Sequence, residues 1–180
     1  HVGTEWHEKS KRDGCVTLAH CIKDILIGSG NISFDRLYEF LGQEKLHEML
    51  RKKGFTRTNV VERYGHKCSS EANKVTNPMT FYDTEGVIYR QPARHSPYNN
   101  FVQDAHSTRL GEGRFDGQYH RGTDFSRNNY MSLKDQHEVL MALMIPALVP
   151  REQRFKLTRE DYKMIHKWMS MYPTESKDPV

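Results

Sequence analysis

The organisation of this chain follows from residues 28–42, which read Gly28-Ser29-Gly30-Asn31-Ile32-Ser33-Phe34-Asp35-Arg36-Leu37-Tyr38-Glu39-Phe40-Leu41-Gly42. Apolar residues recur at helical spacing on both sides of the first four residues, which predicts two helices joined by a tight turn. The turn contains two glycines, which tolerate positive φ, and it carries a hydroxyl on Ser29 and an amide on Asn31. A turn between two buried helices is a rigid place to present two polar side chains.

Ser29 and Asn31 allow two interpretations. Both are good N-cap residues, so they can serve only to cap the second helix, in competition with Ser33. Alternatively, they form a pair with a role in binding or catalysis. Spacing alone favours capping because a Ser-x-Asn pattern is short, but the surrounding sequence shifts the balance towards a functional pair.

The stretch from Thr17 to Phe55 resembles the serine β-lactamase and penicillin-binding protein superfamily around its Ser-x-Asn motif. The matching pieces are Thr17-Leu18-Ala19, Ser29-Gly30-Asn31, Arg36-Leu37-Tyr38-Glu39-Phe40-Leu41-Gly42, and residues 46–50 before Lys53-Gly54-Phe55. Two later runs, 76–82 and 153–158, are similar to β-lactamase-like serine hydrolases of the Bacteroides type. The resemblance covers about Thr17 to Ser176, and only Ser29 and Asn31 match catalytic-motif positions.

This resemblance implies a fold and a mechanism. The fold expected is mainly α: the helical subdomain of the β-lactamase/transpeptidase-like α/β fold, without its sheet and terminal strands. The mechanism implied is covalent acyl transfer on an amide or β-lactam, with no cofactor. Ser29 would relay a proton to the departing nitrogen, and Asn31 would bind the acyl side chain of a β-lactam or peptide-like substrate. The resemblance also implies a periplasmic or secreted location.

Two motifs of that superfamily are absent. No serine is followed three residues later by lysine, so the chain contains no Ser-x-x-Lys nucleophile, and it contains no Lys-Thr-Gly motif. We therefore expect a fragment of a longer hydrolase that is inactive alone and whose partners include the missing part of its own fold. The alternative is a non-catalytic helical interaction module that retains the fold. Whether the chain acts as an enzyme stays open between these two.

The same resemblance draws attention to Glu62-Arg63-Tyr64, which is similar to the start of the omega loop of class A β-lactamases. Gly65 stands where that family has the glutamate that activates the deacylating water. This departure leaves Glu62 and Glu71 as the nearby acids that can approach the site, and it lowers the expectation of efficient β-lactam hydrolysis. The simpler interpretation of Glu62 and Arg63 is a local ion pair.

Length and charge exclude some classes of function. The 180 residues suit one domain: a loose N-terminal arm at 1–14, a single helical (sub)domain at 15–176 with a long irregular loop at about 91–129, and a tail at 177–180. The net charge of +4 is small and mixed in sign, which does not indicate nucleic-acid binding. No apolar run is long enough to span a membrane.

Cysteines and histidines predict no metal site. Cys15, Cys21 and Cys68 lack metal-binding spacing, and their disulfide pairing stays open. His95, His106 and His120 lie in the irregular loop without the spacing of a zinc site.

Local signals predict the remaining elements. Helices are expected at 17–27, 33–41 and 44–53, from Asn77-Pro78, from Ser132 to about 145, and from Thr158. The helix after Ser132 begins with a capping box in which Asp135 replaces glutamate. It is expected to bury Val139, Leu140, Leu143 and Met144. Short strands are expected at 87–89 and around 114–115 and 118–119.

Overall fold

The computed structural model describes residues 16–97, 109–125 and 127–176, and these residues form two compact units. Unit 1 contains the residues up to Phe40, the segment Arg63–Lys67 and the residues from Phe155 onward. Unit 2 contains Leu41–Glu62 and Cys68–Arg154. The predicted arm at 1–14 and the tail at 177–180 lie outside the described residues.

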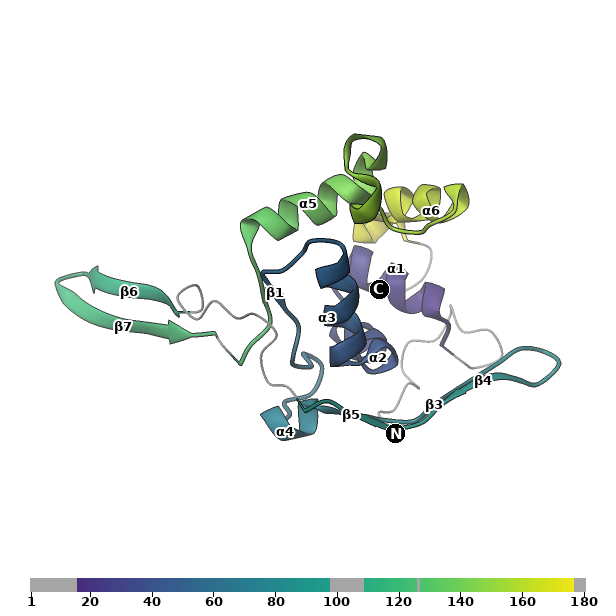
Figure 1. The fold of residues 1–180 in the computed structure, drawn as a ribbon, viewed down its shortest axis with the longest axis horizontal. Helices are drawn as coiled ribbons and strands as arrows, with labels where there is room; N and C mark the ends of the chain where they lie inside the picture. Colours follow the sequence, from purple (N-terminus) through teal and green to yellow (C-terminus); the bar gives the residue numbers. More distant parts are fainter. Residues whose placement is uncertain (1–15, 98–108, 126, 177–180) are drawn as a thin grey trace. The chain divides into compact units, whose positions relative to one another are not determined.

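Unit 1 is built from helices. They are α1 (Leu18–Gly28), α2 (Asn31–Leu41, whose last residue belongs to unit 2), α6 (Arg159–Met169) and the 3-10 turn η4 (Pro173–Glu175). Figure 1 shows α1 and α2 as consecutive helices, and α1 also contacts α6. Among the described residues of this unit, the buried apolar side chains are Cys21, Ile27 and Tyr38.

The start signals of two unit 1 helices are confirmed. The hydroxyl of Thr17 accepts a hydrogen bond from the backbone N–H of His20, at 3.0 Å, and so caps α1. Thr158 and Asp161 form a reciprocal capping box at the start of α6. Both caps use residues three positions apart, which is why the sequence alone could locate them.

Unit 2 contains helices and paired strands. Its helices are α3 (Gln43–Lys52), α4 (Ser70–Asn73), α5 (Leu133–Met144) and the 3-10 turns η2 (Pro146–Leu148) and η3 (Arg151–Gln153). The buried apolar side chains among its described residues are Phe55, Val61, Ala142 and Val149. The expected helix from 44 to 53 is therefore confirmed as α3, within a residue at each end.

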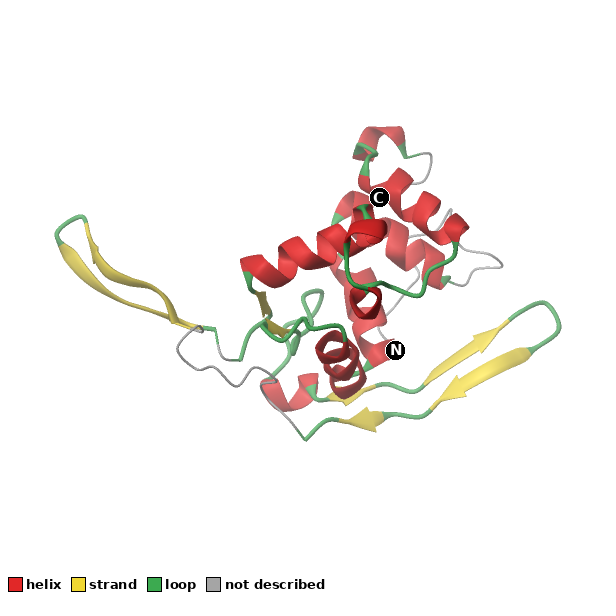
Figure 2. Ribbon diagram, turned by 45° about the horizontal axis from the view of Figure 1, so that its top comes forward, coloured by secondary structure: helices red, strands yellow, loops and turns green. Residues whose placement is uncertain are grey.

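The strands pair two by two and antiparallel, as the yellow arrows of Figure 2 show. The pairs are β1 (Thr58–Asn59) with β8 (Tyr130–Met131), β2 (Val75–Thr76) with β5 (Arg94–His95), β3 (Met79–Tyr82) with β4 (Val87–Gln91), and β6 (Arg109–Phe115) with β7 (Gln118–Asp124). The expectation of a mainly α fold is therefore wrong: the described residues form a mixed α/β structure of helices and short antiparallel strand pairs.

One specific error contributes to that correction. The sequence predicted a short helix from Asn77-Pro78, but the residues that follow form β3. Phe81 on β3 lies opposite Tyr89 on β4, with ring centroids 6.0 Å apart. A cross-strand aromatic pair stabilises strands, and its partner lies beyond the reach of a local helix signal.

The hairpin β6–β7 lies inside the segment predicted to be irregular, at the position of the two short strands expected there. Its turn is Asp116-Gly117, and both residues have positive φ, 53° and 78°. An Asp-Gly pair with positive φ at both residues favours a two-residue hairpin turn of the type that matches strand twist. The remainder of the predicted loop that falls at 98–108 lies outside the described residues.

The expected inward face of α5 is wrong in part. Leu140 is 47% exposed and Met144 is 41% exposed, whereas the buried residues of the helix are Asp135 and Ala142. Asp135 is buried because its carboxylate has partners on the segment that contains β1, as described below. Helical periodicity assigns apolar residues to the core by default, and here a paired acid takes that place.

Candidate functional site

The Ser29–Asn31 turn connects α1 to α2 within unit 1. α1 ends at Gly28, and Ser29 follows in the left-handed conformation, with φ 54° and ψ 40°. The backbone N–H of Ser29 donates to Ile25 O at 3.2 Å, and that of Gly30 donates to Asp24 O at 3.2 Å. These bonds satisfy carbonyls of the last turn of α1, as in left-handed helix terminations generally.

The two side chains predicted to be functional are both exposed. Neither the hydroxyl of Ser29 nor the amide of Asn31 makes a hydrogen bond within the described residues, so neither acts as a side-chain cap there. Ser33, the competing cap, instead donates its hydroxyl to Asp24 Oδ2 at 2.6 Å. Ser29 ends α1 with its backbone, and Asn31 is the first residue of α2.

Glu62 and Arg63, the predicted omega-loop residues, have separate partners and belong to different units. The carboxylate of Glu62 accepts from the side-chain amide of Asn128 at 3.0 Å. The guanidinium of Arg63 pairs with Glu39 at 2.7 Å and lies over the ring of Tyr38, 5.5 Å from its centroid. These contacts give both residues a role in holding their own unit together.

Glu71, the other acid near the expected omega loop, pairs with Lys74 at 2.9 Å. The hydrogen bond from Lys74 lowers the pKa of Glu71. A general base must sit close to the proton it removes and have a pKa near the working pH. A lowered pKa makes Glu71 a weaker base than an ordinary glutamate.

Asp35 is the residue of this region that sequence reasoning missed. It is 6% exposed, and its carboxylate accepts the backbone N–H groups of Tyr64 at 2.7 Å and Gly65 at 3.0 Å. It thereby anchors the segment that follows Arg63 to α2. No sequence signal marks it, because its partners lie about thirty positions away along the chain.

A second missed group consists of Asn129 and His47, both in unit 2. The Asn129 side chain accepts from the backbone N–H groups of Val61 and Glu62, at 2.6 Å and 2.9 Å, and donates to Glu62 O at 2.8 Å. The buried ring of His47 lies 2.6 Å from Gln43 O through Nδ1 and accepts from Val60 N through Nε2 at 2.9 Å. Both side chains fix the backbone of residues 60–62.

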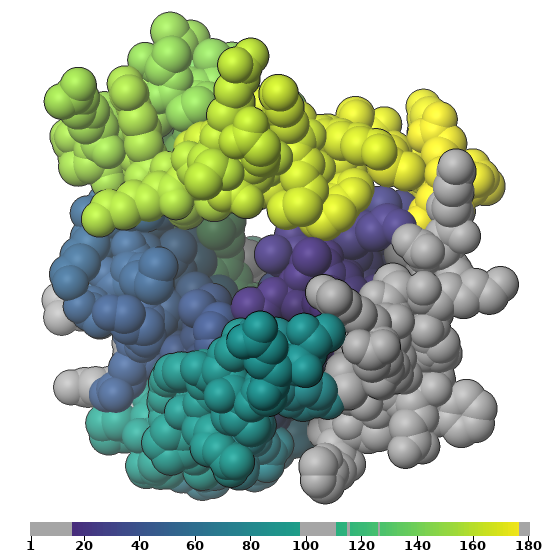
Figure 3. Space-filling model, turned by 90° about the vertical axis from the view of Figure 1, so that its right-hand side faces the viewer, coloured from purple at the N-terminus to yellow at the C-terminus, as the bar shows by residue number. Residues whose placement is uncertain are grey.

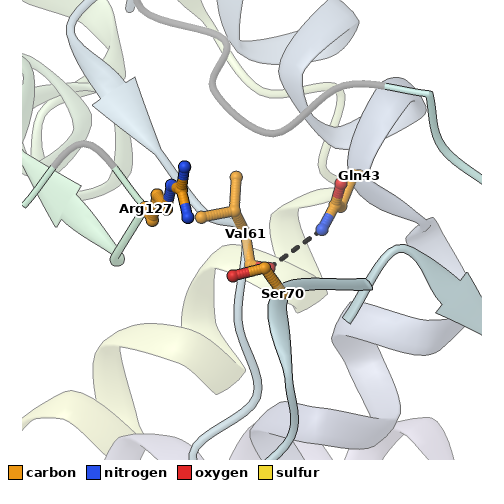
Figure 4. Close-up of a pocket in the computed structure, with 4 residues that line it drawn as sticks. All are labelled: Gln43, Val61, Ser70 and Arg127. Atoms are coloured by element: carbon orange, nitrogen blue, oxygen red, sulfur yellow. Dashed lines mark hydrogen bonds between the residues drawn. The ribbon is translucent and has the colours of Figure 1, made fainter. Parts of the chain in front are cut away.

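A small open pocket lies in unit 2, lined by Gln43, Val61, Ser70 and Arg127. Figure 4 shows these side chains, with the amide of Gln43 donating to Val61 O at 2.9 Å. The same amide donates to Asn73 O at 3.1 Å. The pocket contains none of the residues predicted to be functional, and its buried amide holds backbone segments together.

In the described part of the chain, no cluster of three His, Cys, Asp or Glu side chains is arranged to hold a metal ion. Cys21 and Cys68 are free thiols, and burial raises the pKa of Cys21. Cys15 and His106 lie outside the described residues, whereas His95 and His120 are exposed on strands.

None of the helices in the described ranges combines the length and apolarity that crossing a bilayer requires.

Comparison of the chain with protein-family models, with curated proteins and with solved structures finds no match in any of the three.

Proposed function

We propose that this chain carries the Ser-x-Asn portion of a β-lactamase-like serine hydrolase, with Ser29 as proton relay and Asn31 as the group that binds the acyl side chain. The observation that carries the proposal is the conformation of Ser29. Its φ of 54° lies in the left-handed region, which costs a residue other than glycine about 1–2 kcal/mol. A serine kept where glycine fits better supports a role for its hydroxyl, because strained residues cluster at functional sites.

The chemistry of the two side chains fits these roles. A hydroxyl accepts and donates through one oxygen, which suits a group that takes up a proton and passes it on. A carboxamide offers a donor and an acceptor on separate atoms, which suits recognition of a substrate amide. Both side chains are exposed, and neither has a hydrogen-bond partner among the described residues, so a substrate would not need to displace an internal bond.

The proposal assigns the nucleophile to a segment outside these 180 residues, since the sequence has no Ser-x-x-Lys. In the proposed reaction, that serine attacks the amide or β-lactam carbonyl and loses its proton to the lysine. As the carbon–nitrogen bond breaks, the proton held by the lysine passes to Ser29 and Ser29 gives its own proton to the departing nitrogen; water then hydrolyses the acyl ester. The proposed location is the periplasm or the cell exterior.

The test uses the longer reading frame that the proposal requires, which would supply Ser-x-x-Lys and Lys-Thr-Gly. Acylation by a fluorescent penicillin is measured for the parent protein and for Ser29→Ala and Asn31→Ala. Loss of the relay is expected to reduce the acylation rate about 100-fold or more, the usual scale of acid–base contributions. The matched control is Ser132→Ala, which removes a hydroxyl that caps α5 and should lower stability without slowing acylation.

Ser29→Gly separates function from stability most directly. Glycine adopts the left-handed conformation without the Cβ penalty, so this variant should melt at the same temperature as the parent or higher. It should nevertheless lose acylation as fully as Ser29→Ala. If Ser29→Gly acylates at the parent rate, the relay assignment is wrong.

The 180-residue chain alone should neither hydrolyse nitrocefin nor form a penicillin adduct, because no activated serine is present. Intact-mass spectrometry after incubation with penicillin measures this directly. A stoichiometric mass increase would contradict the proposal and reveal another nucleophile.

A second candidate function is a non-catalytic interaction module. The observation that favours it is the hairpin β3–β4, where Tyr82, Val87, Ile88 and Tyr89 are between 46% and 65% exposed. Figure 3 shows this teal hairpin with its side chains at the surface. Exposed apolar patches mark interaction sites. Reading the flanking gene sequence discriminates the two proposals, because an upstream Ser-x-x-Lys favours the hydrolase and its absence favours the module.

A further inference from the structure

Gly30, between the two proposed site residues, lies against the carboxylate of Asp24, which a side chain at this position would have to displace. An ideal Cβ at this position would lie 1.9 Å from Asp24 Oδ2, 2.4 Å from Asp24 Cγ and 2.9 Å from Asp24 Oδ1. All three carboxylate atoms would overlap it, since real Cβ atoms do not approach heavy atoms that closely. The carboxylate of Asp24 therefore occupies the volume that a side chain at residue 30 would need.

Asp24 makes hydrogen bonds to residues on both sides of Asn31, one through its backbone and one through its side chain. Its backbone carbonyl accepts the N–H of Gly30 at 3.2 Å, and its carboxylate accepts the hydroxyl of Ser33 at 2.6 Å. Ser33 is only 3% exposed and lies in the first turn of α2. The side chain of Asp24 thus links the last turns of α1 to the first turn of α2 across the residues that carry Ser29 and Asn31.

The charge of Asp24 also suits this position. The N-terminus of a helix is stabilised by a nearby anion, yet α2 has no acidic residue in its own first turn. The carboxylate of Asp24, bonded to Ser33 in that turn, supplies the missing negative charge. Hydrogen bonding, steric fit and helix electrostatics all place the same carboxylate beside the turn.

We propose that Asp24 is a positioning residue that holds Ser29 in its left-handed conformation and so presents Ser29 and Asn31 together. The catalytic purpose of this arrangement rests on the proposed function. The effect of Asp24 on the conformation of the turn does not, and it can be measured on the 180-residue chain. A smaller residue at 24 removes both the bond to Ser33 and the volume that packs against Gly30. The Asp24 side chain would act on Ser29 through its neighbours, because it packs against Gly30 and bonds Ser33 in the first turn of α2.

The first test is a double-mutant cycle on the 180-residue chain. Gly30→Ala should lower the melting temperature by about 4 °C or more, since residue 24 must move. The same substitution in an Asp24→Ala background should cost less than half as much, because the conflicting carboxylate is absent. Equal losses in the two backgrounds would mean that the carboxylate does not occupy this volume, and the inference would be wrong.

The second test asks about position rather than stability. NMR backbone chemical shifts of Ser29 report whether it keeps the left-handed conformation. Asp24→Ala should shift Ser29 out of it while the signals of the first turns of α1 remain unchanged, and Asp24→Asn, which still accepts from Ser33, should restore it. The control is Asp83→Ala, which removes a carboxylate that accepts from the backbone N–H groups of Glu85 and Gly86 in a turn of unit 2. Its Ser29 signals should not move.

The outcomes separate this inference from the proposed function. A Ser29 that stays left-handed in Asp24→Ala overturns the positioning role, whatever the acylation assay shows. A penicillin-inert parent protein overturns the hydrolase proposal, whereas a non-additive cycle and a displaced Ser29 would still establish Asp24 as the residue that positions the turn.

Discussion

Arg63 and Glu39 form a buried ion pair within unit 1. Arg63 Nη2 lies 2.7 Å from Glu39 Oε1, Arg63 Nε donates to the same oxygen at 2.9 Å, and the two side chains are 7% and 10% exposed. The guanidinium also lies over the ring of Tyr38. The segment 63–67 is separated in sequence from the rest of its unit, so this pair is one of the contacts that attach it.

Removing one member of this pair should be costly. Glu39→Gln or Arg63→Met leaves the other charge buried, which typically costs about 3–5 kcal/mol. Urea unfolding followed by circular dichroism measures the loss. The double variant Glu39→Leu with Arg63→Met should recover much of it, because no buried charge remains. Glu48→Gln, which breaks the exposed pairs of Glu48 with Lys45 and Lys52, is the control and should change little. A change as small for Glu39→Gln would contradict a structural role for the pair.

Asp135 should matter to stability more than the cap that precedes it. The buried carboxylate accepts from Arg57 N at 2.7 Å and from Thr58 Oγ1 at 2.8 Å, whereas Ser132 caps α5 through the N–H of Asp135 at 3.1 Å. The predicted capping box is therefore only half formed, since the acid is bonded to the segment leading into β1. Asp135→Ala should cost roughly 2–4 kcal/mol, against about 1 kcal/mol for Ser132→Ala.

Equilibrium unfolding of the two single variants and of Thr58→Val checks this ranking. Thr58→Val removes one of the two donors and should fall between the other two variants. A Ser132→Ala loss equal to that of Asp135→Ala would mean that the carboxylate adds nothing beyond the helix cap.

The helix caps and Asp135 show which part of the fold could be predicted from the sequence. The helix starts at Thr17, Ser132 and Thr158 depend on residues three positions apart, so a local pattern located them. The partners of Asp135 lie 77 and 78 positions away, and no periodicity encodes such a distance. The same reason explains the missed strands of β2–β5 and β1–β8, which are only two residues long and pair residues far apart.

In the candidate site too, local features were predictable and contacts formed only on folding were not. The turn at Ser29 and Asn31 was predicted from local glycines and helical spacing, and the structure places both residues there. The partners of Glu62 and Arg63 were not predicted, because Asn128 and Glu39 approach them only in the folded chain. The closeness of Asp24 to Gly30 is equally invisible in a sequence, since it depends on how α1 ends.

His47 predicts a pH dependence of stability. Its ring is 1% exposed and donates through Nδ1 to Gln43 O while Nε2 accepts from Val60 N, so it must be neutral, and burial lowers its pKa to about 4 from 6.5. The folded pKa is below the unfolded value. The stabilisation is therefore complete above pH 6.5 and is lost as the pH falls towards 4, at about 1.4 kcal/mol per pH unit and roughly 3 kcal/mol in all.

Denaturant unfolding at pH 7, 6, 5 and 4 measures this effect as a difference between wild type and His47→Gln. The difference removes the contribution of the carboxylates, which both proteins share. The gap in unfolding free energy should narrow as the pH falls below 6.5. His95→Gln, which changes an exposed histidine, is the control and should follow the wild-type curve. Parallel curves for wild type and His47→Gln would show that His47 does not titrate as its contacts require.

Gly65 gives the last prediction, because it stands where the resembling family has a catalytic glutamate. An ideal Cβ there would lie 2.5 Å from Ile32 Cδ1 and 2.9 Å from Asp35 Oδ2, beside the carboxylate that accepts the N–H groups of Tyr64 and Gly65. Gly65→Ala should therefore cost about 1–3 kcal/mol through overpacking. Gly65→Glu should cost more, because it also brings a second carboxylate next to Asp35. In the longer protein that the hydrolase proposal requires, it should not accelerate deacylation.

Ile32→Val deletes the nearest atom, so Gly65→Ala should be less destabilising in that background, as measured by urea unfolding of the four proteins of the cycle. An equal cost in both backgrounds would contradict the steric explanation, and faster deacylation by a stable Gly65→Glu would show that this position can still carry the family's glutamate.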